Sequence, residues 1–224
     1  KPQWGRAEEL LAKLQAAREE GMTITCDQYP YTATSTSMTA LLPHWAHDGG
    51  VPALLQRLKE PTQRLKEETG VEMENRGGPA SILVSGTHGY HPEWEGKTVE
   101  QLSQEFQMDP VDTVIRVLEQ CGSSVACIYF CINEEDMLRI MSDMDICVGS
   151  DGYNFSYDRS ITRTDPHPRS FGTFPRFLRL VREHKLIPLE DAVHKITGLP
   201  AQILGLADRG ILREGAAADI TVFD

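Results

Sequence analysis

The stretch that decides the fold is Ile146-Cys147-Val148-Gly149-Ser150-Asp151-Gly152. Its apolar, partly β-branched beginning predicts a short buried strand, and the Gly-Ser-Asp-Gly that follows predicts a turn at the carboxyl end of that strand. In α/β barrels the carboxyl ends of the strands form the catalytic face, so Asp151 is a candidate for chemistry. Asp and Gly are also ordinary turn residues. The local spacing alone therefore favours a turn aspartate that caps the next segment.

Segments with helical and strand-like patterns alternate around this stretch. Apolar side chains at helical spacing over residues 6–20 lead through Gly21 directly into a predicted strand over 22–29. Polar loops are predicted over 31–37 and 153–173. The other predicted helices cover 49–68, 98–106, 111–119, 134–141, 174–183, 189–196 and 199–206, and the other predicted strands cover 81–85, 125–132, 146–150 and 218–223. This alternation predicts an α/β fold with a parallel sheet.

Composition restricts the possible classes of partner. The formal net charge of −11 over 224 residues argues against a nucleic-acid partner, which would require a basic surface. No apolar run approaches the ~18 residues of a membrane span, and no signal-peptide pattern is visible, so no membrane partner is expected. The five cysteines form no C-x-x-C pair. A reducing, cytoplasmic setting is therefore the expectation.

Two histidine pairs have the i, i+3 spacing that can hold a metal from a helix. They are His44 with His47 and His88 with His91. The first pair has no third ligand nearby, and glycine and proline near the second make a regular helix there unfavourable. Both pairs are therefore interpreted as surface histidines.

The segment Asp165-Pro166-His167-Pro168-Arg169-Ser170-Phe171-Gly172 follows the decisive strand and is a second candidate for function. Arg169 could bind a carboxylate through two parallel hydrogen bonds. It could equally be a structural arginine that ties the loop to an acidic neighbour. The chain contains no P-loop, G-x-G-x-x-G or G-x-S-x-G motif, which argues against phosphate binding and against a serine hydrolase.

Taken together, several stretches resemble one family, the N-acyl-D-amino-acid deacylases (D-aminoacylases) of the amidohydrolase superfamily. They are Cys26-Asp27-Gln28-Tyr29-Pro30-Tyr31-Thr32-Ala33, Ile128-Tyr129-Phe130, Val148-Gly149-Ser150-Asp151-Gly152, the run from His167 to Arg176, and Leu206-Ala207-Asp208-Arg209-Gly210 with Gly215, Ala218 and Asp219 after it. The resemblance covers nearly the whole chain, and the set is specific although each piece is weak alone.

The resemblance implies a (β/α)8 TIM barrel that uses zinc to hydrolyse an amide of a small-molecule N-acyl amino acid. In such sites an aspartate at the end of the last barrel strand accepts a proton from the attacking water and passes it to the leaving nitrogen. Asp151 matches that aspartate. The resemblance therefore replaces the turn interpretation with a catalytic one.

The resemblance also implies a set of substrate-binding residues, which are Tyr31, Ser37, Tyr129, Ile132, His167 and Arg169. Tyr31 and Ser37 match residues whose hydroxyls contact the carboxylate or amide of the substrate. Tyr129 and Ile132 match a wall of the apolar acyl pocket, where the family often has methionine at the position of Ile132. His167 and Arg169 lie in a characteristic loop.

One departure from the family limits these expectations. The metal ligands of the family include a His-x-His pair, which is absent here, and none of the seven histidines fits a ligand position. We therefore expect no metal ligand in this chain, except that Asp151 could contact a metal through a bound water. The expected zinc would have its ligands upstream of Lys1.

The chain is accordingly expected to be the C-terminal part of a catalytic barrel. Residues 1–207 would contain the last two barrel strands, at 22–29 and 146–150, with an inserted subdomain over roughly 36–132. Residues 208–224 would be a strand that re-enters a flanking β-sandwich domain. Such a chain should not hydrolyse an amide alone. The alternatives are a cyclic amidase like dihydroorotase or hydantoinase, and a non-catalytic amidohydrolase-like module.

Overall fold

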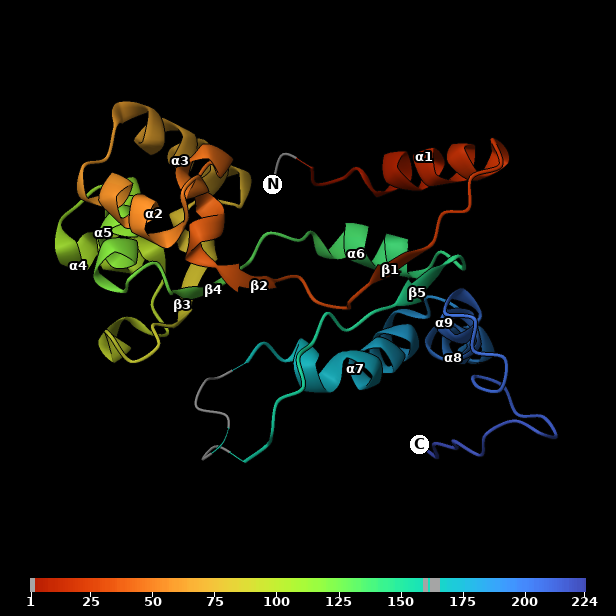
Figure 1. Ribbon diagram of the computed structural model, residues 1–224. Coiled ribbons are helices and arrows are strands. Elements are labelled where there is room, and N and C mark those ends of the chain that lie inside the picture. The colour runs from red at the N-terminus through yellow and green to blue at the C-terminus, as the bar shows by residue number, and fades with distance from the viewer. Residues whose placement is uncertain (1–2, 159–160, 162–165) are drawn as a thin grey trace. The chain divides into compact units, whose positions relative to one another are not determined.

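The computed structural model describes residues 3–158, 161 and 166–224. The chain divides into two units (Figure 1). Unit 1 is built on Thr32–Ile132, and unit 2 is built on Trp4–Tyr31, Asn133–Asn154 and Pro168–Asp224. Both units combine helices with a small sheet, in agreement with the predicted α/β class.

Unit 2 is organised around two short parallel strands, β1 (Cys26–Gln28) and β5 (Ile146–Val148), which lie side by side in Figure 1. Cys26 pairs with Ile146 and Gln28 with Val148. The helices of this unit are α1 (Ala7–Glu19), α6 (Glu134–Met141), α7 (Arg169–His184), α8 (Leu189–Ile196) and α9 (Gly198–Ile203). Helices α6, α8 and α9 pack against β5, whose two apolar ends are buried.

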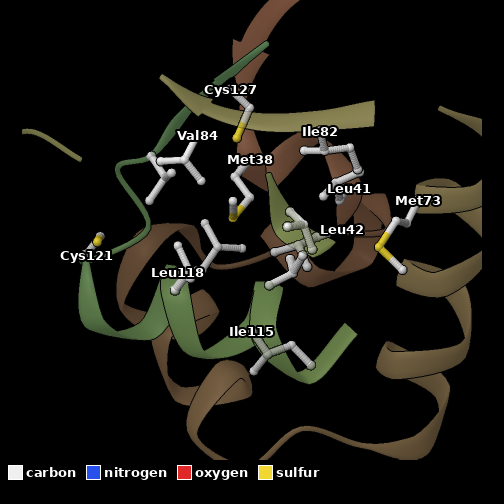
Figure 2. Packing of buried hydrophobic residues seen from close by; sticks show 14 of the residues in the cluster. Met38, Leu41, Leu42, Met73, Ile82, Val84, Ile115, Leu118, Cys121 and Cys127 are labelled. Atoms are coloured by element: carbon white, nitrogen blue, oxygen red, sulfur yellow. The ribbon is translucent and has the colours of Figure 1, made fainter. Parts of the chain in front are cut away.

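Unit 1 contains a three-stranded antiparallel sheet in the order β2-β4-β3. The strands are β2 (Thr34–Ser37), β3 (Ile82–Gly86) and β4 (Ala126–Tyr129), and the helices are η1 (Met38–Leu41), η2 (His44–His47), α2 (Gly50–Lys59), α3 (Gln63–Asn75), η3 (Pro79–Ser81), η4 (Pro92–Trp94), α4 (Val99–Phe106) and α5 (Pro110–Gln120). Apolar side chains of the sheet, η1 and α5 point toward one another in Figure 2 and form one buried core. Met38 and Leu118 are fully buried there, and burial of such a side chain contributes about 1.5–3 kcal/mol.

The starts of α4, α5 and α6 lie within one residue of the predicted ones. Thr98 and Gln101 form a complete capping box at α4, in which each side chain accepts a hydrogen bond from the other residue's backbone. Asp109 caps α5 ahead of Pro110, and Asn133 caps α6 by accepting from the Asp136 amide at 2.9 Å. Short polar caps are read well from sequence because they act within one turn of helix.

Several predicted boundaries are wrong. The predicted loop over 31–37 contains β2, because Thr34–Ser37 pair along β4 and the partner strand decides their conformation. The single helix over 49–68 is two helices, because Pro61 interrupts the run and Thr62 caps the second one. Both parallel strands are shorter than predicted.

The last two corrections concern the C-terminal third. The predicted loop over 153–173 ends early, since α7 already begins at Arg169; its residues 159, 160 and 162–165 lie outside the described residues. Residues 218–223 form no strand, because a strand requires a backbone partner and the described part of the chain pairs none with them. Among the described residues, no helix has both the length and the apolar character needed to cross a membrane.

Candidate functional site

Asp151 lies just beyond the carboxyl end of β5, where the sequence places it. Its backbone is left-handed, with φ of 47°, a conformation that aspartate tolerates better than most residues. The side chain is 67% exposed, and its Oδ2 lies 2.9 Å from Nη2 of Arg169. The carboxylate is thus accessible to a small molecule while a cation holds one of its oxygens.

Two glycines allow the backbone near Asp151 to follow this path. A Cβ on Gly149 would lie 2.6 Å from Oδ1 of Asp27 on the neighbouring strand. A Cβ on Gly152 would lie 2.8 Å from the Cα of Ser170, at the start of α7. Close packing against backbone atoms therefore requires glycine at position 152, whereas a Cβ at position 149 would displace the Asp27 side chain.

Arg169 is the buried member of the ion pair, with only 7% of its side chain exposed. Its guanidinium lies over the ring of Tyr29, 5.2 Å from the ring centroid. A cation in the first turn of a helix opposes the helix dipole, so helix stability does not explain this residue. A guanidinium fixed by burial and stacking is instead well prepared to bind a carboxylate.

Tyr31 is also buried, at the point where β1 leaves the sheet. Arg176 of α7 lies over its ring at 4.9 Å from the centroid, and the hydroxyl is hydrogen-bonded to the Thr173 side chain. Burial raises the pKa of the Tyr31 hydroxyl above its ordinary value, against the opposing effect of the Arg176 charge. The phenol is neutral at physiological pH and able to donate a hydrogen bond.

The predicted substrate-binding residues Ser37, Tyr129 and Ile132 lie in unit 1 and make structural contacts there. The Ser37 hydroxyl accepts from the Thr39 amide at 3.2 Å and so caps η1. Tyr129 is fully buried, donates to the Ser37 carbonyl at 2.9 Å, and has its hydroxyl pKa raised by burial. Ile132 is half-buried, and its amide donates to the Thr32 carbonyl. Their predicted contacts with a substrate stay predictions.

The histidines occupy varied positions. His167 is buried, with 7% exposed, so the sequence prediction of a loop residue in contact with substrate stays a prediction. His44 and His47 lie at the two ends of η2. His91 stacks on Trp94 with 3.7 Å between the ring centroids, which is a structural role. His184 and His194 lie in the last turns of α7 and α8, at the negative end of each helix dipole.

The amidohydrolase family model matches residues 146–224, which include Asp151 and Arg169. The chain is 33% identical over 222 residues to an N-acyl-D-glutamate deacylase of Alcaligenes xylosoxydans xylosoxydans, covering 99% of this chain and 36% of the relative. It is 32% identical over 224 residues to a D-aminoacylase of the same organism, covering 100% of this chain and 37% of the relative. A crystal structure of N-acyl-D-glutamate deacylase from Bordetella bronchiseptica, complexed with zinc and a phosphonate inhibitor, matches with a TM-score of 0.67 at 29% identity.

The match to that structure covers 96% of this chain and 36% of the solved one. Over nearly its whole length, the chain is similar to the D-aminoacylases of the amidohydrolase superfamily. The family resemblance predicted from the sequence is therefore confirmed, and with it an amidohydrolase-type α/β fold. The chain spans about a third of the length of the relatives that it matches.

The described residues contain no arrangement of side chains that would hold a metal ion. Within residues 3–158, 161 and 166–224, no group of three or more His, Cys, Asp or Glu side chains is arranged to hold a metal ion. The five cysteines are free thiols, and burial raises the pKa of Cys127 to about 12, which disfavours the thiolate that a metal requires. The described residues therefore do not fit a zinc site of their own.

Sequence reasoning missed the residues that surround the predicted site. Asp27 packs on Gly149, while Gly172 and Arg176 contact Tyr31. A signal was present, because Tyr29 and Tyr31 are two residues apart just beyond a predicted strand and Arg169 precedes Arg176 by two helical turns. Tertiary packing decides which helix lies against which strand end. Neither the spacing of the tyrosines nor that of the arginines carries this information.

Proposed function

We propose that this chain supplies the proton-carrying aspartate and the carboxylate-binding arginine of a zinc-dependent enzyme that hydrolyses N-acyl-D-amino acids. The products are a carboxylate and a free D-amino acid. The observation that carries this proposal is the 2.9 Å pairing of the exposed Asp151 carboxylate with the buried Arg169 guanidinium at the end of β5. Zinc is proposed because the solved N-acyl-D-glutamate deacylase holds it.

Asp151 is the proposed carrier of the proton. As water attacks the amide carbonyl carbon, the carboxylate accepts a proton from that water. When the C–N bond breaks, the same proton goes to the leaving nitrogen, which departs as an amine. An ionised carboxylate that is exposed on one side is suited to both steps.

Arg169 is the proposed ligand of the substrate's own carboxylate. A planar guanidinium binds a carboxylate through two parallel hydrogen bonds, and burial keeps the fork of Arg169 in one orientation. The Tyr31 hydroxyl, which the resemblance also assigns to the substrate, provides a neutral donor in the same unit. These groups would select N-acyl amino acids over amides without a carboxylate.

We also propose the domain organisation expected from the family. In this proposal β1 and β5 are the last two strands of a (β/α)8 barrel, residues 36–132 are an inserted subdomain, and residues 208–224 re-enter a flanking β-sandwich. The parallel pairing of β1 with β5 supports the first part, and the separate core of unit 1 supports the second. Free cysteines support the proposed cytoplasmic setting.

The experiment is an assay of the enzyme that contains this chain, loaded with zinc. The substrates are N-acetyl-D-glutamate and N-acetyl-D-methionine, their L enantiomers, and dihydroorotate. Release of amino acid from a D substrate is expected, and hydrolysis of dihydroorotate alone would establish the cyclic-amidase alternative. Absence of any hydrolysis, despite bound zinc, would favour the non-catalytic alternative.

Two variants connect that activity to the site. Asp151→Asn should lower kcat by about 100-fold or more, because general acid–base groups contribute about 10²–10⁴-fold. Arg169→Met should raise KM for carboxylate-bearing substrates. Arg179→Met is the matched control, because Arg179 is an exposed arginine of the same helix that pairs with Glu183.

Residues 1–224 alone should neither retain zinc nor turn over substrate. Zinc-dependent turnover by this chain alone would contradict the inference that its described residues hold no metal.

A further inference from the structure

Helix α7 and the end of β1 contact each other through two arginine–tyrosine pairs. Arg169 lies over the ring of Tyr29, and Arg176 lies over the ring of Tyr31. The arginines are seven residues apart, which places them on one face of a helix, and the two tyrosines flank Pro30 just beyond the end of β1. The two tyrosine rings are 6.4 Å apart and tilted by 47°. The two arginine–tyrosine pairs are therefore neighbours along the contact between α7 and the end of β1.

Arg176 is fixed from two sides in this arrangement. Its guanidinium carbon lies 4.9 Å from the centroid of the Tyr31 ring, which is within the range of a cation–π interaction. Its Nε donates a hydrogen bond to the carbonyl of Pro30, the residue that immediately precedes Tyr31. One side chain thus contacts both the ring of Tyr31 and the backbone that carries it.

The hydroxyl of Tyr31 is held by the turn of α7 that precedes Arg176. The hydroxyl oxygen lies 3.1 Å from the point that a Cβ on Gly172 would occupy, so only glycine leaves this space free. Thr173 forms a side-chain hydrogen bond with Tyr31, and its own hydroxyl donates to the Arg169 carbonyl at 2.9 Å. The ring and the hydroxyl of Tyr31 are therefore both positioned by α7.

We propose that Arg176 and Gly172 are positioning residues that hold the Tyr31 hydroxyl in the orientation in which it binds substrate. The inference rests on the proposed function, which gives Tyr31 its role. A tyrosine side chain rotates about two bonds, and a hydroxyl that is already oriented loses less freedom when a substrate binds. Arg176 acts through Tyr31 and touches no reacting atom.

The direct test observes Tyr31 itself in residues 1–224, with 3-fluorotyrosine placed at position 31 and followed by fluorine NMR. Arg176→Met should shift or broaden the resonance because it removes the cation that lies over the ring, and Gly172→Ala should do so because its Cβ would press on the hydroxyl. Arg176→Lys keeps a cation over the ring and should give a smaller change. Arg182→Met, at an exposed arginine in the last turn of the same helix, should leave the resonance unchanged. A resonance that is the same in Arg176→Met and in the parent would overturn the proposal. This measurement requires no catalytic activity.

The second test separates positioning from catalysis in the zinc-loaded enzyme that contains this chain. Arg176→Met should raise KM for N-acetyl-D-glutamate by about 2- to 30-fold, the equivalent of a cation–π interaction, and should change kcat little. The same substitution made in a Tyr31→Phe background should have no further effect on KM, because the hydroxyl that Arg176 positions is then absent. Equal effects of Arg176→Met in both backgrounds would refute the proposal.

The two tests also keep this proposal distinct from the proposed function. If the enzyme hydrolyses no N-acyl-D-amino acid, the proposed function fails, and an altered fluorine resonance still supports positioning of Tyr31 by α7. If hydrolysis occurs and KM is unchanged in Arg176→Met, the proposed function stands and the role of Arg176 at the substrate fails.

Discussion

Substituting Gly152 by alanine should destabilise the start of α7 and separate the ion pair beside it. A Cβ at this position would lie 2.8 Å from the Cα of Ser170 and 3.1 Å from the carbonyl oxygen of Arg169. Both are backbone atoms, so no side-chain rotation relieves the overlap, and the helix start must move by several tenths of an ångström. Overpacking of this kind costs about 1–3 kcal/mol. Loss of the contact between the exposed Asp151 and the buried Arg169 adds about 1 kcal/mol.

Hydrogen exchange measured by mass spectrometry is the appropriate assay, because it reports on α7 separately from the rest of the chain. A cost of 1–3 kcal/mol corresponds to about 5- to 150-fold faster exchange of protected amides near the start of this helix. The melting temperature should fall by about 2–12 °C in a chain of this size. Gly70→Ala is the control, because Gly70 lies inside α3 and its added Cβ would make an ordinary contact of 3.5 Å. Unchanged exchange in Gly152→Ala would refute the packing argument.

Three further predictions concern single groups outside the site. Burial lowers the pKa of Lys195 to about 8 in the folded chain. Because the unfolded chain binds the Lys195 proton more tightly, the free energy of unfolding should rise as pH increases from about 8 to about 10.5. Lys195→Met should flatten that rise in urea unfolding, and equal slopes for the two proteins would contradict this. Cys127 is fully buried and its thiol has a pKa near 12, so iodoacetamide at pH 8 should leave it unmodified in the native protein; labelling as fast as in urea would disprove its burial. Thr98→Ala should cost about 1 kcal/mol through loss of the α4 cap, whereas Thr98→Ser should cost little, and calorimetry that finds the two alike would exclude the cap.

The parts of the structure that local chemistry determines could be predicted from the sequence. Thr98, Asp109 and Asn133 mark helix starts because each side chain bonds an amide only two or three residues away. The turn that carries Asp151 follows from an apolar run ending in glycine, serine and aspartate. The family resemblance then converted that turn into a candidate site, which composition and spacing alone did not achieve.

The parts that depend on distant partners could not be predicted. Thr34–Ser37 form a strand only because β4 lies beside them, while residues 218–223 have a strand-like pattern and the described structure gives them no partner. The same limit applies at the site. Arg169 could be recognised as a carboxylate ligand, but its burial against Tyr29 depends on where α7 packs.

The pairing of β1 with β5 has a practical consequence for handling the chain. Within the described residues this sheet has only two strands, so both of them are edges, and an edge offers unsatisfied backbone groups to any other strand in solution. Each strand is only three residues long, however, which limits the number of hydrogen bonds that a second molecule could form with it. Purified samples should therefore associate weakly and reversibly as concentration rises, and dilution should restore single chains.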